Sequence, residues 1–426
     1  MPVRESDYRR IFACLDGVRH AGLAVSGGAD STALMHMARR WQLAAGPSAP
    51  RLSVLSVDHG LRDGSAREAE WVAEQARTLG LDAAILRWSG KKGGSALQER
   101  ARQARYGLMA GYAHANGLDA LVTAHHLDDQ AETFLMRLAR GSGVDGLAGI
   151  PKSGQWAGLA VHRPLLGLSK ARLVATLKQF GVDWLEDPSN DDARFERVRI
   201  RAAMEELESL GLGAEALARS AYRLRRAQDA LELTTDRFLA SHASLNDLGF
   251  GQIRTDALHD VAEDIALRAL ARVIQAVGGQ PSAPNMARLE SLVAAIRAGD
   301  EAARTLGGCR VVPDSDDVLV LRETGRSALE TLILRPGESG LWDNRFHVSL
   351  DAGVRAPVEV RALGEAAYGT VRARLGAPVN LPARAADGLV SFWRDNAVLC
   401  VPAIGFYATS RQNCGCRARF VNHLGL

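Results

Sequence analysis

The stretch that decides the fold is LAVSGGADST, residues 23–32, in which an apolar run breaks into serine, glycine and aspartate before turning amphipathic. A strand that ends in glycines and reopens as a helix leaves several backbone N–H groups unpaired and pointing one way. Those N–H groups and the helix dipole both favour negative charge. The stretch therefore predicts an anion site directly after a strand.

Short β-rich runs alternate with helical runs from residue 21 to about residue 125. Such alternation predicts a parallel sheet covered on both faces, with ligands gathering beyond the carboxyl ends of the strands. Polar residues cluster at three predicted strand ends, 26–31, 58–60 and 125–129. We therefore expect these three ends to converge on one site.

The pattern of residues changes in the rest of the chain. Helix formers dominate after about residue 205, and shorter runs punctuated by Gly, Pro and Asp follow toward the C-terminus. We predict an α/β protein with three domains. A Rossmann-like, parallel-sheet nucleotide-binding domain is expected over 1–205, a mostly helical domain over 206–325 and a small α+β domain over 326–426.

Composition narrows the class of protein. The apolar stretches all fall short of the roughly 20 residues that a membrane helix needs. The N-terminal MPVRESDYRRIF lacks an apolar signal core, so we expect a cytoplasmic protein that does not bind membranes. The formal net charge of +3 is too small to indicate a nucleic-acid partner by itself.

The five cysteines are an odd number, spread over a long chain, which is typical of reduced thiols rather than of a disulfide framework. Cys414 and Cys416 have a spacing that could bind a metal ion. Because the sequence shows no second Cys/His pair beside them, we expect a structural or incidental use.

The glycine loop is neither a Walker loop nor a dinucleotide fingerprint, because GxxxxGK[ST] is absent from the sequence and the stretch 23–32 does not read GxGxxG. What remains is a glycine pair flanked by serines, with Asp30 able to hold Mg²⁺ beside phosphates. Taken alone, the stretch could equally be a plain turn in which Ser26 or Ser31 caps a helix.

The segment SGGADS resembles the SGGxDS signature of the PP-loop ATP pyrophosphatases. The resemblance implies that ATP is bound by this loop and that pyrophosphate leaves after a substrate oxygen is adenylated. It assigns Asp30 to Mg²⁺ and places Asp58 and His59 beside the nucleotide. The expected ATP-binding residues of the loop are Ser26, Gly27, Gly28, Ala29, Asp30 and Ser31.

A second segment, HHLDDQAET over 125–133, crowds acids at a predicted helix start, since Glu132 shares a helical face with both Asp128 and Asp129. These acids could hold Mg²⁺ or a cationic substrate. They could also be ordinary first-turn acids favoured by the helix dipole, with His125 and His126 as turn histidines.

Four segments in the first 201 residues together resemble the tRNA(Ile)-lysidine synthases: VDHGLR, HHLDDQAET, RPLLGLSKARL and DWLEDPSNDDARFERVRIR. The resemblance implies an ATP-dependent C–N ligase that acts on the wobble cytidine of tRNA(Ile) with a CAU anticodon. The cytidine is adenylated on its C2 oxygen, and the ε-amine of free L-lysine then displaces AMP.

The resemblance also implies substrate contacts. Asp129 and Glu132 would receive the ammonium groups of lysine, and with Asp30 they form the expected catalytic set. A basic stretch would contact tRNA: Arg194, Arg197, Arg199 and Arg201. Where the family usually reads RN-x-IR, this chain has Val198, so the asparagine contact is lost or supplied by another residue.

The later domains are expected to position the tRNA body, and a homodimer is one assembly that the chain could form. A second arginine group, at 219, 223, 225 and 226, either meets phosphates or forms a solvated face.

Other functions compete with this interpretation. A PP-loop tRNA thiolase shares the loop and the substrate class, but it needs cysteines near the ATP site, and only Cys14 lies in the N-terminal domain. An amide-forming ATP pyrophosphatase acting on small molecules would need neither the arginine-rich segment nor the extra domains. A catalytically inactive tRNA-binding protein would not need Asp30 and the acidic helix start.

Overall fold

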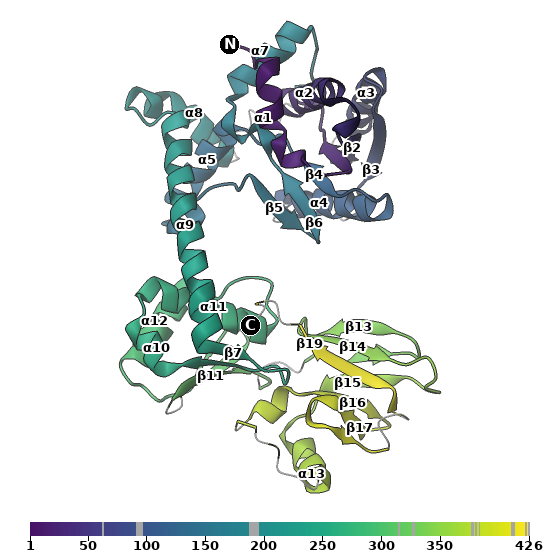
Figure 1. The fold of residues 1–426 in the computed structure, drawn as a ribbon, viewed down its shortest axis with the longest axis vertical. Helices are drawn as coiled ribbons and strands as arrows, with labels where there is room; N and C mark the ends of the chain where they lie inside the picture. Colours follow the sequence, from purple (N-terminus) through teal and green to yellow (C-terminus); the bar gives the residue numbers. More distant parts are fainter. Residues whose placement is uncertain are drawn as a thin grey trace. The chain divides into compact units, whose positions relative to one another are not determined.

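The computed structural model describes residues 1–61, 64–90, 97–186, 196–313, 316–325, 329–375, 379, 381–382, 384–409, 414–421 and 424. The chain divides into two compact units, Met1–Asp229 and Ala230–Leu426 (Figure 1).

The first unit is built on a six-stranded sheet with the order β3-β2-β1-β4-β6-β5, in which only β5 runs antiparallel to its neighbour. Leu23 of the central strand β1 pairs with Val54 of β2 and with Val122 of β4. The strands are β1 (His20–Ala24), β2 (Arg51–Asp58), β3 (Asp82–Arg87), β4 (Ala120–Val122), β5 (Ser153–Trp156) and β6 (Leu159–His162).

Helices cover both faces of this sheet because its strands are apolar on both sides. Val54 and Leu55 of β2 point to opposite faces and belong to different buried clusters. One face packs against α1 (Tyr8–Ile11), α2 (Ala29–Ala45), α3 (Ser65–Thr78) and α7 (Lys170–Phe180). The other face packs against α4 (Leu97–Ala115) through Tyr106, Met109 and Ala113.

A further group of helices follows the fourth strand and completes the first unit. It contains α5 (Leu127–Leu138), α6 (Val144–Leu147), α8 (Glu196–Ser209) and the start of α9 (Ala214–His242). Phe134 of α5 packs with Leu217 and Ala221 of α9 in a buried cluster, so α5 is held between the sheet and the later helices.

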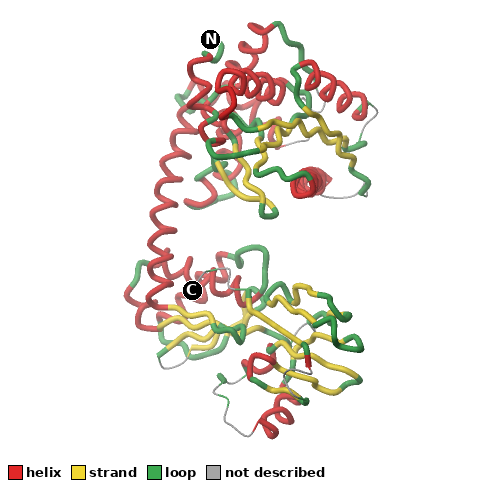
Figure 2. Tube along the Cα trace, turned by 45° about the vertical axis from the view of Figure 1, so that its right-hand side comes forward, coloured by secondary structure: helices red, strands yellow, loops and turns green. Residues whose placement is uncertain are grey.

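The second unit begins with helices packed on an antiparallel sheet, which Figure 2 shows as red helices beside yellow strands. The helices are α10 (Thr255–Asp260), α11 (Glu263–Gly278) and α12 (Met286–Arg297). The sheet has the order β7-β8-β11-β10-β9, formed by β7 (Ala243–Leu245), β8 (Gly251–Arg254), β9 (Arg304–Leu306), β10 (Cys309–Pro313) and β11 (Asp317–Arg322).

Two further antiparallel sheets, of five and three strands, share one buried core in the rest of this unit. The first has the order β12-β15-β16-β17-β18 and carries α13 (Glu365–Leu375) on its other face. The second has the order β13-β14-β19. Their strands are β12 (Leu332–Leu334), β13 (Ser339–Trp342), β14 (Phe346–Leu350), β15 (Val358–Ala362), β16 (Val390–Arg394), β17 (Ala397–Val401), β18 (Phe406–Tyr407) and β19 (Cys416–Phe420).

The predicted fold class is confirmed: a parallel-sheet α/β domain comes first, then a helical region, then antiparallel sheets. The helix formers after about residue 205 did not indicate the strands β7 and β8. The short runs from about residue 305 onward, punctuated by Gly, Pro and Asp, suggested hairpins, and β9, β10 and β11 lie there. The division into three domains at 205 and 325 stays a prediction.

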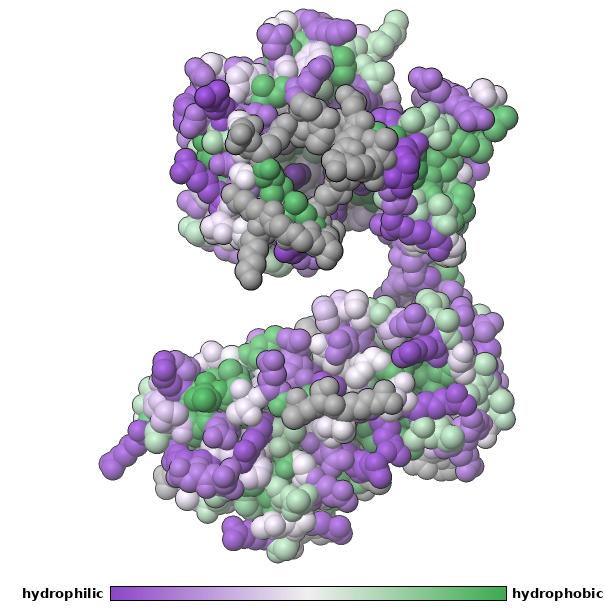
Figure 3. Space-filling view, turned by 180° about the vertical axis from the view of Figure 1, so that it is seen from behind, coloured by the Kyte–Doolittle hydropathy of each residue, from purple (hydrophilic) through white to green (hydrophobic). Residues whose placement is uncertain are grey.

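The surface in Figure 3 mixes hydrophilic residues with smaller hydrophobic patches, as on ordinary globular proteins. Among the described residues, every helix is too short or too polar to cross a bilayer.

Candidate active site at the ends of the central strands

The loop from β1 to α2 depends on two glycines for different reasons. Gly27 has a φ of +90°, and a Cβ there would lie 2.7 Å from Cδ1 of Leu185, so any side chain is strained and crowded. Gly28 is extended, and nothing lies within 4 Å of the position that its Cβ would take. The loop is therefore closely packed at Gly27, whereas the space beside Gly28, at the start of α2, is open.

Hydroxyl groups fix this loop from within. The Ser26 N–H donates to Oγ of Ser31 (3.1 Å), and that hydroxyl donates to the Gly28 carbonyl (3.0 Å). Thr32 Oγ1 donates to the Gly27 carbonyl (3.0 Å). The serines and the threonine thus hold the backbone shape on which an anion site depends.

The N-terminus of α2 has no side-chain cap. Its N-cap residue is Gly28, and the backbone bond from Thr32 N–H to the Gly28 carbonyl (3.0 Å) closes the first turn. The N–H groups at 29–31 precede that bond and have no helical carbonyl to satisfy them. Capping by Ser26 or Ser31, one of the two expectations for this stretch, is therefore wrong, and the helix start is arranged as an anion site.

Asp30 lies in the first turn of α2 and faces the beginning of α5. Its Oδ2 is 3.4 Å from Nε2 of His126. Its Oδ1 is buried and has no hydrogen-bond partner within the described part of the chain. A buried carboxylate oxygen without a partner, beside a helix start whose first N–H groups are free of helical partners, fits a Mg²⁺ ligand.

His126 connects three carboxylates at the start of α5. It occupies the N-cap, and its N–H donates to Oδ2 of Asp129 (3.0 Å). Nδ1 lies 3.4 Å from Oδ2 of Asp128, and Nε2 contacts Asp30 and Asp129 at 3.4 and 3.5 Å. Burial disfavours the charged ring, but hydrogen bonds to Asp128 and Asp30 and the charge of Asp129 raise the pKa of His126 to about 10.

A protonated His126 has a clear effect on its neighbours. The contact from the Asp129 N–H to Nδ1 is long (3.4 Å). A protonated Nδ1 cannot accept this N–H and donates to Asp128 instead. Asp128 also accepts the Lys170 N–H at the start of α7 (2.8 Å). Burial works against its ionisation, but the bonds from His126 and Lys170 hold the pKa of Asp128 below its usual value.

Glu132 lies one turn farther along α5 and is almost completely buried. Its Oε1 accepts from Nε (2.9 Å) and Nη2 (2.8 Å) of Arg201 on α8. Its Oε2 is buried without a hydrogen-bond partner among the described residues. Burial raises the pKa of Glu132, and the charge of Arg201 offsets only part of that effect.

The other predicted nucleotide neighbours are engaged in local structure. Asp58 ends β2 and accepts from the Gly60 N–H (2.9 Å) and the Ser65 hydroxyl (2.6 Å). His59 contacts Arg105, with Nε2 3.1 Å from Nη2, and its Nδ1 is buried without a partner in the described structure. Burial and the charge of Arg105 lower the pKa of His59 to about 4, so the ring is neutral near pH 7.

His125 lies between β4 and α5, with Nδ1 2.8 Å from the Thr123 hydroxyl. Burial lowers its pKa to about 4 against the opposing charge of Asp129. The two adjacent histidines therefore differ in charge, since His125 is neutral where His126 is protonated.

The predicted tRNA-binding arginines are placed differently from one another. Arg194 lies outside the described residues. Arg197, Arg199 and Arg201 are all exposed on α8, and Arg201 also pairs with the buried Glu132. In the second arginine group, Nη2 of Arg225 donates to the Ala148 (3.0 Å) and Gly149 (2.9 Å) carbonyls, so this side chain ties α9 to the turn after α6.

Sequence reasoning missed the role of His126, although HHLDD contained the signal: a histidine at an N-cap followed by two acids. It also missed the pairing of Arg201 with Glu132, which joins two segments far apart in the chain.

Several known proteins are similar to this chain. A PP-loop domain model matches residues 4–207. The tRNA(Ile)-lysidine synthase of Ruegeria pomeroyi is 38% identical, and the match covers 82% of this chain and 80% of that protein. The tRNA(Ile)-lysidine synthase of Methylobacterium nodulans is 47% identical over 67% of this chain and 85% of its own. A solved structure, the U34-tRNA thiolase NcsA from Methanococcus maripaludis, covers 52% of this chain and 79% of that chain, with 17% identity and a TM-score of 0.44.

Proposed function

The chain belongs to the tRNA(Ile)-lysidine synthase family, and from that premise we propose how its residues form lysidine on tRNA(Ile). It is an ATP-using PP-loop ligase. The thiolase alternative lacks support, since curated relatives at 38% to 47% identity are lysidine synthases. In the proposed reaction, the C2 oxygen of the wobble cytidine attacks the α-phosphorus of ATP and pyrophosphate leaves. The ε-amine of lysine then attacks C2, AMP leaves and the amine loses a proton.

The observation that carries the proposal is the contact between Asp30 and His126. It brings the first turn of α2 against the acidic start of α5, with Asp30 Oδ2 3.4 Å from the ring of His126. An adenylating site needs a phosphate-binding surface beside the groups that receive the second substrate. This contact supports one shared site for both half-reactions.

ATP is proposed to lie over the open helix start at Gly28, with its phosphates on the N–H groups at 29–31 and beside Ser26. The backbone donors stabilise the charge that develops on the leaving pyrophosphate. Asp30 would hold Mg²⁺, which would neutralise phosphate charge there. The neutral ring of His59 at the end of β2 is a candidate neighbour of the nucleotide, with its buried Nδ1 still to be satisfied.

Lysine is proposed to bind through its ammonium groups to Asp129 and to Oε2 of Glu132. The buried Oε2 lacks a partner in the described structure, so an incoming N–H donor would satisfy it. Carboxylates also favour the protonated, non-nucleophilic amine, so a base must remove one proton. Because burial raises the pKa of Glu132, this carboxylate is the proton acceptor that we propose.

The tRNA is proposed to meet the exposed Arg197 and Arg199 and the adjoining Arg194. The cytidine must leave its stack to reach the loop, so we expect a flipped wobble base. The parts of the chain at 206–325 and 326–426 are proposed to hold the tRNA body. We also propose that the protein acts in the cytoplasm and does not bind membranes, and a homodimer remains a proposed assembly.

The test is transfer of labelled lysine to RNA. The protein is incubated with ATP, Mg²⁺, labelled lysine and a tRNA(Ile) transcript with the CAU anticodon. A transcript that differs only in a wobble uridine is the matched control. The proposal predicts label on the first transcript alone, and equal labelling of both transcripts would contradict it.

A further inference from the structure

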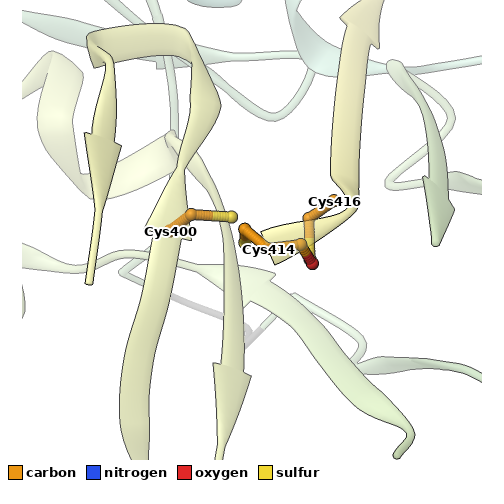
Figure 4. A group of neighbouring side chains, drawn as sticks. All are labelled: Cys400, Cys414 and Cys416. Carbon is orange, nitrogen blue, oxygen red and sulfur yellow. The ribbon is translucent and has the colours of Figure 1, made fainter. Parts of the chain in front are cut away.

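Three of the five cysteines meet in the core of the second unit. Cys400 lies on β17, and Cys414 and Cys416 flank Gly415 at the beginning of β19. Their Sγ atoms all lie within 4.8 Å of one another, and all three residues are buried (Figure 4). The remaining two, Cys14 and Cys309, are not part of this cluster.

The backbone is shaped to bring these sulfurs together. The pairing of β16 with β17 shifts between Phe392 and Trp393, which pair with Cys400 and Val398, so Leu399 is an extra residue beside Cys400. Such a bulge re-aims the neighbouring side chain. Two irregular features, the bulge and the turn at Gly415, thus occur on the two segments that carry the cluster.

Gly415 itself admits no side chain. Its φ is +62°, and a Cβ there would lie 2.6 Å from Cγ2 of Val354. Its carbonyl accepts the Asp351 N–H (2.9 Å), which fixes the turn. The glycine lets the chain bend between two cysteines, so that both reach Cys400.

The burial of three thiols so close together favours a bound cation. Three thiolates without one would bury like charges beside one another, whereas a metal ion would compensate them.

We propose that Cys400, Cys414 and Cys416 bind one Zn²⁺ ion as thiolates. Each thiol releases its proton to solvent on binding. Thiolates around a tetrahedral zinc ion, with Zn–S bonds of about 2.3 Å, lie roughly 3.8 Å apart, so sulfurs within 4.8 Å of one another need only small shifts. A cubane iron–sulfur cluster fits less well, because each cysteine binds a different iron and the sulfurs stand farther apart. Water can supply the fourth ligand.

The zinc ion would fasten two sheets to each other. Cys400 belongs to the sheet β12-β15-β16-β17-β18, and Cys416 belongs to β13-β14-β19. Among the described strands, the last one, β19, is paired with β14 alone, and it reaches the other sheet only through side-chain packing in the shared core. The site therefore stabilises the C-terminal sheets, and it is independent of the function proposed for the first unit.

The test uses the full chain, purified without chelator from cells grown with zinc. Metal analysis is expected to give about one zinc per chain, and Cys400→Ser and Cys416→Ser to lower zinc affinity at least about tenfold. Cys309→Ser is the matched control, because Cys309 is equally buried and donates to the Ile274 carbonyl (3.2 Å), a bond that serine can keep. This control is expected to retain its zinc.

A second measurement needs no variant. Chelation of the wild-type chain is expected to expose Cys400, Cys414 and Cys416 to alkylation, mapped by mass spectrometry, with Cys309 unchanged. Added Co²⁺ is expected to give thiolate-to-cobalt charge-transfer absorption. The proposal would be overturned if the purified chain held no zinc, had three free thiols in the cluster and bound neither added Zn²⁺ nor added Co²⁺. A disulfide within the cluster, an iron–sulfur chromophore, or zinc retained by both serine variants would also overturn it.

Discussion

Oδ2 of Asp30 lies 3.4 Å from Nε2 of His126, so one imidazole ring joins the first turn of α2 to the N-terminus of α5. The same ring contacts Asp128 and Asp129. Three carboxylates at the ends of two parallel strands would repel one another without a cation between them. His126 supplies that cation in the protein itself.

His126→Gln is predicted to change how stability depends on pH. The folded pKa of His126, about 10, lies above its unfolded value of 6.5. Its contribution is therefore complete below the unfolded value and is lost as pH rises through the folded value. The variant is expected to lose about 2–3 kcal/mol of unfolding free energy near neutral pH. Its loss should shrink toward alkaline pH, as measured by urea denaturation.

His114→Gln is the control for that series, because His114 is exposed on α4, away from the carboxylates. It should follow the wild-type pH dependence. If His126→Gln retained the wild-type slope in alkaline solution, the imidazole would not be the cation that holds this site.

Gly27→Ala is predicted to lower stability, and Gly28→Ala is predicted to weaken ATP binding. Gly27 combines a φ of +90° with a neighbour 2.7 Å from the added Cβ, so alanine there should cost about 1–3 kcal/mol of stability. Gly28→Ala should leave stability within about 0.5 kcal/mol of wild type. It adds a methyl group above the helix start, however, and should weaken ATP binding. Thermal unfolding and nucleotide titration separate the two effects, and a fully active Gly28→Ala variant with unchanged ATP affinity would argue against the placement of the phosphates.

Asp129→Asn and Glu132→Gln are predicted to raise KM for lysine roughly 10- to 100-fold, since each removes a charge that we propose to face an ammonium group of lysine. Asp128→Asn is the matched control, because Asp128 is already bonded to the Lys170 N–H. It should lower stability and leave KM for lysine close to wild type. If Asp128→Asn showed the largest rise in KM for lysine, Asp128 would be the carboxylate that recognises lysine, and the proposal would be wrong.

Arg201→Met is predicted to move the acid limb of the kcat/KM profile to higher pH. Arg201 lowers the pKa of Glu132, so its loss leaves burial to raise that pKa further. The carboxylate then ionises only at higher pH, and lysine binding weakens in acid. Arg199→Met, on the same exposed helix, should weaken tRNA binding with no shift in this limb. If both variants had the same kcat/KM profile against pH, Arg201 would not control the ionisation of Glu132, and it would have no part in lysine binding.

The sequence predicted those parts of the site that depend on local pattern. The glycine pair between an apolar strand and a helix predicted an anion site, with a serine cap as the open alternative. The alternation of strands and helices predicted that the carboxyl ends of the parallel strands lie at one edge of the sheet. Asp30, Asp129 and Glu132 lie at these ends as expected, although their roles remain predictions.

Long-range side-chain relations could not be predicted in the same way. His126 reaches Asp30 only because β1 and β4 are adjacent in the sheet. The pairing of Arg201 with Glu132 depends on how α8 packs on α5, which no local pattern specifies. The cysteine cluster was missed for a similar reason, because Cys400 reaches Cys414 and Cys416 through the packing of two sheets.

The most direct test of the central claim separates the two half-reactions. Wild-type protein and the variants Asp30→Asn and Asp129→Asn are mixed with tRNA(Ile) and labelled ATP, first without lysine and then with it. Wild type and Asp129→Asn are predicted to release pyrophosphate and form adenylated tRNA without lysine, whereas Asp30→Asn does neither. Only wild type should convert the adenylate efficiently when lysine is added. Normal adenylation by Asp30→Asn would contradict the account, because the glycine loop and its aspartate would then not be the site of ATP activation.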